Sequence, residues 1–232
     1  MMNVKLINHT PEPEKLVASA AKLCYSSKAD IDSLIQSIDT KEAEKFVEKL
    51  MSLGHQSPLE HVTFTFAIEG VSRALLAQLS RHRIGISLSV RSQRYCTEDN
   101  FEVVTPTSIA NNAEAKHVFD TTMDVIQAAY NVLIDQYNIP KEDARAILPN
   151  ACCTRMLVTM NARELLHFFS ERCCNRAQAE IRTLAYKMLI LCKEVAPALF
   201  ANAGAKCDQI GYCPEGKKSC GRKPTLDKLC KN

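Results

Sequence analysis

The chain has 232 residues, of which 29 are basic and 26 acidic, so its formal net charge is only +3. This length suits one large domain or two small ones, and the balanced charge excludes a general nucleic-acid binder. The sequence holds no apolar run of about 18 residues, and its start lacks the apolar core of a secretion signal, so we expect a cytoplasmic protein without a membrane span.

Eleven cysteines are many for this length, and in a cytoplasm they are expected to remain reduced. Seven lie in apolar or helical stretches and are expected to pack in the core. Four others lie in a tail rich in glycine, proline and lysine: Cys207, Cys213, Cys220 and Cys230. Because none forms the tight Cys-x-x-Cys pair of a structural zinc site, we expect ordinary thiols and no metal, with zinc as the weaker alternative.

The first half of the chain shows apolar patterns of both helical and strand periodicity. Pro13 suits the first turn of a helix, and Gly54 suits the end of the next one. Taken in order, the predicted elements are a strand over 4–7, helices over 13–25 and 40–54, a strand over 62–69 and a helix over 71–79.

The second half is predicted to hold helices over 112–137 and 140–148, a strand over 152–160, and helices over 161–169 and 175–200. The last helix would run about 39 Å if unbroken. Asn161 is expected to cap its helix, with Glu164 placed as in a capping box. The order of elements lacks regular strand–helix alternation, which favours the α+β class. We expect one domain over 1–204 and a cysteine-bearing tail over 205–232.

The most informative segment is 81–95, where four arginines alternate with serines: Arg81, Arg83, Arg91 and Arg94 with Ser87, Ser89 and Ser92. A guanidinium group stays charged, and its planar fork fits phosphate oxygens two at a time. Hydroxyl groups add uncharged donors to such a site. We therefore hypothesise that this segment binds the phosphates of a nucleotide.

An arginine-rich strand that binds RNA backbone is the alternative interpretation of this segment. Such a surface usually includes lysines, yet none lies between Lys49 and Lys116. In 84–90 the apolar residues alternate with small or polar ones, which indicates an extended piece packed on one side. This pattern favours a defined pocket over a diffuse patch.

Three further clusters contain residue types that bind anions or cofactors. The loop 55–61 carries two histidines and a glutamate between a helix end and a strand, where function and a plain turn are equally compatible. The start of the helix at Asn161 favours an anion, although ordinary capping explains it too. Arg172 and Arg176 share a helical face, which points to water or a shared anion. Cys173 and Cys174 between them are a secondary candidate for a nucleophile.

Together these clusters resemble the flavin-dependent thymidylate synthase family over about His55 to Arg182. The resemblance rests on four motifs in one order: His55-x-Ser57-Pro58-x-Glu60-His61, Arg81-His82-Arg83 followed by Ser92-x-Arg94-Tyr95, Arg145-x-x-Leu148-Pro149, and Asn161-Ala162-Arg163 leading to Arg172. Residues 84–91 are one residue longer than is usual in the family, which we interpret as a bulge. His167 stands where some relatives have asparagine, and Arg176 where some have histidine.

The resemblance implies an α+β fold with a mixed sheet flanked by long helices. It also implies reductive methylation of dUMP to dTMP, with methylenetetrahydrofolate as carbon donor, FAD as redox carrier and NADPH as reductant. The expected assembly is a homotetramer with active sites where subunits meet, and the domain over 1–204 would be the catalytic one. No nucleic-acid partner is implied.

The family motifs assign roles to individual residues of this chain. Arg172 is the expected catalytic residue, facing the uracil ring of dUMP. The expected dUMP contacts are Gln78, Arg81, Ser92, Gln93, Arg94, Arg145 and Arg172. The expected FAD contacts are His55, Ser57, Arg81, His82, Arg83, Asn161, Ala162, Arg163 and His167.

Overall fold

The computed structural model describes residues 1–27 and 30–226. The chain forms two compact units, each with most of its residue contacts inside itself. Of the described residues, the first unit comprises 1–3, 67–81 and 88–157, and the second comprises 4–27, 30–66, 82–87 and 158–226. Residues 205–226 thus belong to the second unit, and the division at residue 204 stays a prediction. Among the described residues, no helix is both long and apolar enough to span a membrane.

Four strands form one sheet in the order β1-β2-β4-β3. They are β1 (Asn3–His9), β2 (Thr63–Ser72), β3 (Ile86–Val90) and β4 (Cys153–Asn161). The backbone hydrogen bonds Thr10 N to Thr63 O, Arg73 N to Cys152 O, and Asn161 N to Gly85 O join the end of one strand to the start of its neighbour. The sheet is therefore antiparallel. The α+β class is confirmed, but the expectation of a mixed sheet was wrong, because each strand begins at the end of the sheet where its partner ends.

Strand β2 shows why alternation predicted this part of the fold correctly. Its residues Phe64, Phe66 and Ile68 are buried, while Thr63 is exposed on the opposite face. Side chains alternate between the faces of a strand, so a half-buried strand carries apolar residues at every second position. The arginine-rich segment forms β3 by the same rule, with Ser87 and Ser89 exposed. The predicted extended piece is confirmed over 86–90, but not at 84–85, where the chain bends at Gly85 (φ +72°) and leaves Ile84 exposed.

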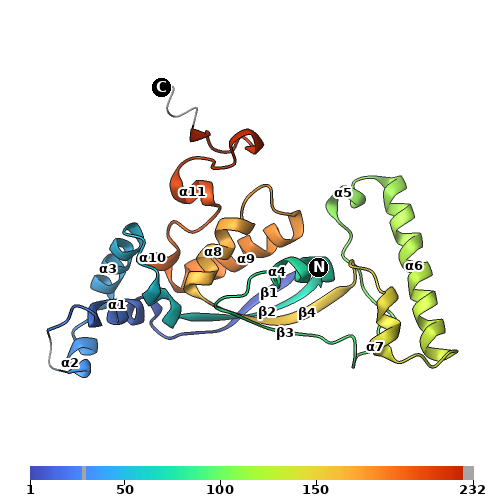
Figure 1. The fold of residues 1–232 in the computed structure, drawn as a ribbon, viewed down its shortest axis with the longest axis horizontal. Coiled ribbons are helices and arrows are strands. Elements are labelled where there is room, and N and C mark those ends of the chain that lie inside the picture. Colours follow the sequence, from blue (N-terminus) through green and yellow to red (C-terminus); the bar gives the residue numbers. More distant parts are fainter. Residues whose placement is uncertain (28–29, 227–232) are drawn as a thin grey trace. The chain divides into compact units, whose positions relative to one another are not determined.

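Figure 1 labels the helices of the second unit, and phenylalanine rings pack against one another in the core of this unit. Phe200 lies edge-on to Phe64 and to Phe169, at centroid distances of 5.4 and 6.0 Å. Such pairs add to the burial energy of the rings. The elements of this unit are α1 (Pro13–Leu23), α2 (Ile31–Gln36), α3 (Thr40–Ser52), η1 (Ser57–His61), α8 (Ala162–Arg172), α9 (Ala179–Val195), α10 (Pro197–Phe200), α11 (Lys206–Ile210) and η3 (Gly216–Lys218).

The single helix expected over 175–200 is not present. Helix α9 begins at Ala179, after Gln178 caps the amides of Glu180 and Ile181, and it ends at Val195. Pro197 then starts the separate short helix α10. Proline has no amide hydrogen and its ring collides with the preceding turn, so the helix stops before it.

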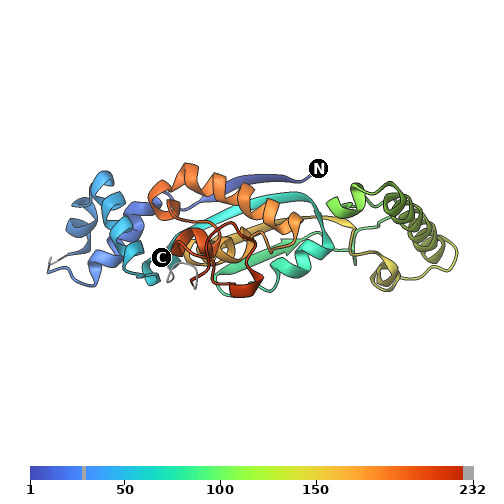
Figure 2. The ribbon, with the colours of Figure 1, turned by 90° about the horizontal axis from the view of Figure 1, so that it is seen from above.

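Helices of the first unit are α4 (Arg73–Leu79), α5 (Thr107–Ala110), α6 (Ala113–Asp135), α7 (Lys141–Ala144) and η2 (Arg145–Ile147). Figure 2 shows the long helix α6 beside α5 and α7. Asn112 caps α6 by accepting a hydrogen bond from the Ala115 amide. Tyr130 is the buried residue of this helix, and its hydroxyl group accepts a hydrogen bond from the Glu98 amide at 3.4 Å. Most of α6 therefore faces outward.

Candidate functional site

A chain of hydrogen bonds in the second unit links two buried side chains, His82 and Glu164, to the partly buried Arg172. Nδ1 of His82 lies 2.7 Å from Oε1 of Glu164, and the Nε of Arg172 donates a hydrogen bond to Nε2 of His82 at 3.2 Å. A carboxylate only accepts, so Nδ1 carries the proton and Nε2 is the acceptor. His82 was expected to contact a cofactor, yet both of its ring nitrogens are used within the protein, and it orients the predicted catalytic Arg172.

The helix that carries this chain begins as predicted. The Asn161 side chain accepts a hydrogen bond from the Glu164 amide at 2.8 Å, which confirms its role as a cap. The Glu164 side chain does not complete a capping box, because His82 binds it instead. The cap thus sets the start of α8, and Glu164 and His167 follow on its first turns.

A cavity of about 480 Å³ lies at this helix start. Its lining includes Gln56, Glu60, Ile84, Asn161, Arg163 and His167. Three of the nine residues expected to contact FAD line it: Asn161, Arg163 and His167. Ile84 is 84% exposed and offers an apolar side chain among these polar groups. The cavity therefore combines donors, acceptors and an apolar surface.

The backbone at Gly85 makes room for the Asn161 side chain. Gly85 has φ +72°, and a Cβ atom there would lie 2.5 Å from Nδ2 of Asn161. The Gly85 carbonyl accepts a hydrogen bond from the Asn161 amide at 2.9 Å. Only glycine adopts this conformation without strain and also permits such close approach. The cavity wall therefore depends on residue 85 having no side chain.

The other residues expected to contact FAD are distributed around this region. Arg163 pairs with Glu60, and both side chains are about half exposed. His55, Ser57 and Arg83 are exposed, and Ala162 is fully buried at the first position of α8. The Ala162 amide donates a hydrogen bond to the Val62 carbonyl at 2.8 Å, so this residue is engaged inside the protein. Arg81, expected to contact both ligands, is exposed at the end of the first unit.

The first unit gathers a second group of predicted residues around Glu142. Nε and Nη2 of Arg94 donate hydrogen bonds to Oε2 of Glu142 at 3.0 and 2.8 Å. Nε of Arg145 donates to the Glu142 backbone carbonyl at 3.1 Å. The Ser92 hydroxyl group accepts a hydrogen bond from the Arg94 amide at 3.2 Å. The structure thus brings Ser92, Arg94 and Arg145 together, although 48 residues separate Arg94 from Glu142.

Gln93 and Gln78, also expected at dUMP, differ in their contacts. Gln93 is 8% exposed, and within the described residues its buried Nε2 atom has no hydrogen-bond partner. Leaving a buried donor without a partner costs about 1–3 kcal/mol. Gln78 donates to the Ala74 carbonyl within its own helix at 3.3 Å. Gln93 lies between Ser92 and Arg94 in sequence. A ligand that accepted a hydrogen bond from its Nε2 atom would remove this energetic cost.

Arg91 has a structural role. Its guanidinium group pairs with the buried carboxylate of Glu98 and donates to the Thr97 carbonyl at 3.1 Å. The hydrogen bond to Glu98 raises the Arg91 pKa. The backbone carbonyl of Arg91 accepts a hydrogen bond from Arg73 at 2.8 Å. The Arg91 guanidinium group is thus already paired within the first unit, with the buried Glu98 as its partner.

Cys173, the residue after Arg172, is poorly suited to act as a nucleophile. Cys173 is fully buried, and burial raises its thiol pKa to about 12. Arg172 and Arg176 were considered able to depress this pKa, but desolvation has the larger effect. Cys152 is buried in the same way, with its pKa raised to about 12. A thiol with such a pKa holds almost no thiolate at neutral pH.

Sequence reasoning missed two carboxylates of these groups. Glu164 was assigned only to a helix cap, and Glu142 was not singled out. A sequence signal exists for Glu164, since one turn of α8 separates it from His167 and such spacing places both on one helix face. His82, Glu164 and His167 also bring three ligand-type atoms within 4.8 Å of one another. A cation there would face the Arg172 guanidinium group, so the hydrogen-bonded chain is the better description.

Comparisons with known proteins connect this geometry to a function. A family model described as thymidylate synthase complementing protein matches residues 5–198. A flavin-dependent thymidylate synthase of Geobacter sulfurreducens is 50% identical and covers 98% of this chain and 97% of its own length. One of Nitratidesulfovibrio vulgaris is 48% identical over 95% of each chain. The crystal structure of a flavin-dependent thymidylate synthase from Helicobacter pylori, complexed with FAD and dUMP, aligns with TM-score 0.68 and 26% identity over 87% of this chain and 99% of that one.

Proposed function

The chain belongs to the flavin-dependent thymidylate synthase family, the enzymes that convert dUMP to dTMP, and we propose that the two residue groups described above bind its ligands. The group around Arg94 binds dUMP, and the cavity at the start of α8 binds FAD. The observation that carries this assignment is the oriented Arg172, on the helix that also lines the cavity. Its guanidinium group donates to His82, and His82 is in turn held by Glu164.

The dUMP phosphate takes the place of a carboxylate at Arg94. A phosphate dianion accepts two parallel hydrogen bonds from a guanidinium fork, as Glu142 accepts two now. Ser92 adds a hydroxyl donor. Arg145 adds a second fixed positive charge, and its hydrogen bond to the Glu142 backbone carbonyl holds it near Arg94. The unsatisfied Nε2 of Gln93 supports a ligand at this loop, because a substrate oxygen would complete its hydrogen bonding. Gln78 and Arg81 are proposed to complete the dUMP contacts.

The cavity at α8 fits a flavin dinucleotide by the chemistry of its lining. Arg163 and the Asn161 cap offer donors for a pyrophosphate, and the helix start favours negative charge. Exposed Ile84 offers an apolar contact for a planar ring. By the family motifs, the proposed FAD contacts also include His55, Ser57, Arg81, His82, Arg83 and His167. The bound flavin supplies the redox chemistry, while the protein supplies position and field.

Arg172 is proposed to stabilise charge on the uracil ring. Addition at C6 of uracil builds negative charge at O4 and N3, and a preorganised guanidinium group at that edge would lower the cost. His82 and Glu164 fix this orientation before the substrate binds. No cysteine nucleophile is needed, which agrees with the buried Cys173 and its raised pKa.

Methylenetetrahydrofolate as carbon donor and NADPH as reductant follow from the family assignment. A homotetramer with active sites between subunits is part of the same proposal. Helix α6 supports an assembly, because it exposes three valines spaced seven residues apart on one face: Val118, Val125 and Val132. No disulfide links the cysteines in the described part of the chain, which suits the proposed cytoplasmic location.

The direct test is dTMP formation by the purified protein, supplied with dUMP, methylenetetrahydrofolate, NADPH and FAD. The protein should be yellow, and Arg172→Ala should abolish dTMP formation while its circular dichroism spectrum stays unchanged. Full turnover by this variant would refute the role of Arg172. Colourless protein that binds RNA with a steep salt dependence would instead favour the RNA-binding alternative.

A further inference from the structure

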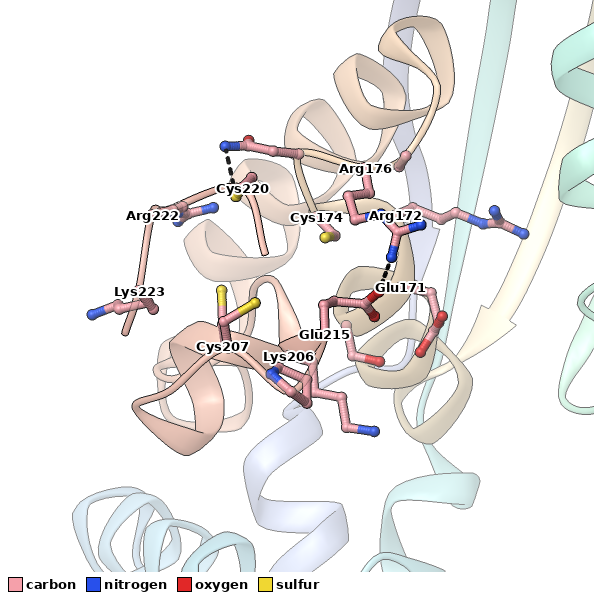
Figure 3. A pocket seen from close by; sticks show the side chains of 15 residues that line it. Glu171, Arg172, Cys174, Arg176, Lys206, Cys207, Glu215, Cys220, Arg222 and Lys223 are labelled. Carbon is pink, nitrogen blue, oxygen red and sulfur yellow. Dashed lines mark hydrogen bonds and ion pairs between the residues drawn. The ribbon is translucent and has the colours of Figure 1, made fainter. Parts of the chain in front are cut away.

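The tail of the chain encloses a cavity that the thymidylate synthase reaction does not explain. Four cysteines line this cavity of about 230 Å³: Cys174, Cys207, Cys213 and Cys220. They come from three places, which are the turn after α8, helix α11 with the loop that follows it, and the segment after η3. In Figure 3 the sulfur atoms of Cys174, Cys207 and Cys220 face the same space.

The cavity is buried on one side and positively charged around its edge. Cys207 and Cys213 are 8% and 7% exposed. Two carboxylates line the cavity, Glu171 and Glu215, and they are outnumbered by five basic residues: Arg172, Arg176, Lys206, Arg222 and Lys223. Arg176 is paired with Glu215, and Arg222 with Asp208. Neutral thiols need no neighbouring cations, because an S–H group packs in an apolar core as a small hydrophobic side chain does. Four thiolates around a dication carry a net charge of about −2, and neighbouring cations stabilise that charge.

The tail is held so that these cysteines stay together. The Cys213 amide donates to the Pro224 carbonyl at 2.7 Å, which brings the two ends of the last loop side by side. Arg222 donates to Asp208 at 2.6 Å and to the Tyr186 hydroxyl group at 3.1 Å, and that hydroxyl group donates to the Cys173 carbonyl. Nδ2 of Asn175 donates to Sγ of Cys220 at 3.6 Å (Figure 3). These contacts fix the tail against the turn between α8 and α9.

We propose that Cys174, Cys207, Cys213 and Cys220 bind a thiolate-coordinated metal centre, either a zinc ion or an iron–sulfur cluster. Within the described residues, no three of these sulfur atoms lie within 4.8 Å of one another. A tetrahedral zinc ion with 2.3 Å bonds needs sulfur atoms about 3.8 Å apart, so zinc binding requires the tail to close further. A cluster of several irons spans a wider opening and needs less closure.

The set of ligands differs from the one that the sequence suggested. The zinc alternative grouped Cys230 with the other three tail cysteines, but Cys230 lies outside the described residues. Cys174 takes the fourth position in the cavity. Spacing could not reveal this, because 33 residues separate Cys174 from Cys207 and no tight pair exists.

A metal centre here would also stabilise the catalytic helix. Cys174 follows Arg172 by two residues, and Arg172 itself lines the cavity. Coordination of Cys174 would therefore fix the end of α8 and restrict the Arg172 backbone. This consequence rests on the proposed function, whereas metal binding does not.

Metal analysis of the full chain tests the proposal without any activity assay. Protein purified under nitrogen should contain about one zinc per chain, or about four irons with matching acid-labile sulfide. Cys207→Ser and Cys174→Ser should each lower that content at least tenfold, whereas the matched control Cys24→Ser, which changes an exposed cysteine on the end of α1, should retain it.

Two results would overturn the proposal. One is wild-type protein with less than about a tenth of a zinc or iron atom per chain. The other is unchanged metal content in both serine variants. If those variants fail to fold, Cys220→Ser replaces them, since Cys220 is exposed and its loss leaves the core packing intact. Metal loss with normal dTMP formation would separate the metal centre from the proposed catalytic role of Arg172.

Discussion

Arg172 and Glu164 lie two turns apart on α8 and bind opposite nitrogens of the same imidazole. Nε of Arg172 donates to Nε2 of His82 at 3.2 Å, and Nδ1 of His82 lies 2.7 Å from Glu164. The carboxylate fixes the tautomer, and the tautomer provides the acceptor that orients the guanidinium group. Removing the carboxylate should therefore act on the reaction through Arg172.

The Glu164→Ala variant should lower kcat for dTMP formation by about 100-fold, because a misplacement of about 1 Å at a catalytic group costs that much. KM for dUMP should change far less. Glu164→Gln retains an acceptor for Nδ1–H and should recover most of the rate. Glu194→Ala removes an exposed carboxylate from α9 and serves as control. Wild-type kcat in Glu164→Ala would contradict a positioning role.

Under the proposed assignment, the pair formed by Arg94 and Glu142 competes with dUMP. Both side chains are about half exposed, and such pairs are worth about 0.2–1 kcal/mol. If dUMP phosphate replaces the carboxylate, Glu142→Gln should tighten dUMP binding by about 1.5- to 5-fold. Calorimetric titration measures this directly. Asp143→Asn, one residue along the same helix, is the matched control, and weaker dUMP binding by Glu142→Gln would argue against a phosphate site at Arg94.

The buried cysteines should resist alkylation. The Cys173 pKa rises from 9.0 to about 12, which corresponds to about a thousandfold smaller thiolate fraction at pH 8. Exposed Cys24 should react with iodoacetamide at least 100-fold faster than Cys173 or Cys152, as followed by peptide mass spectrometry. The folded chain holds these protons more tightly than the unfolded chain does, so stability should fall as pH rises from about 9 towards 12. Rapid labelling of Cys173 in folded protein would disprove this burial.

Sequence periodicity predicted elements well where one face of an element is buried. The alternation in 62–69 and the cap at Asn161 both appear in the structure. The relative direction of the strands could not be predicted, because a half-buried strand shows the same alternation of apolar and polar residues in a parallel and in an antiparallel sheet. The broken helix was readable in principle, since Pro197 inside a helical pattern ends the helix at the residue before it.

The site was predictable as a set of residues, and its internal partners were not. Family motifs named Arg94, Arg172 and His82, but a motif carries no information on which carboxylate reaches each side chain. Glu142 lies 48 residues from Arg94, and Glu164 lies 82 residues from His82. Such contacts depend on packing between distant elements, which a single sequence does not specify.

Binding of FAD to the cavity at the start of α8 is the central claim, and titration of flavin-free protein with FAD tests it most directly. The variant Arg163→Ala removes a lining cation, and Arg155→Ala removes an exposed arginine of the first unit as its matched control. We predict one FAD per chain in the wild type and wild-type affinity in Arg155→Ala. In Arg163→Ala the affinity for FAD should fall by about tenfold or more, because a charged hydrogen bond is worth about 1.5–3 kcal/mol. Equal FAD affinity in all three proteins, or no FAD binding by the wild type, would contradict the claim.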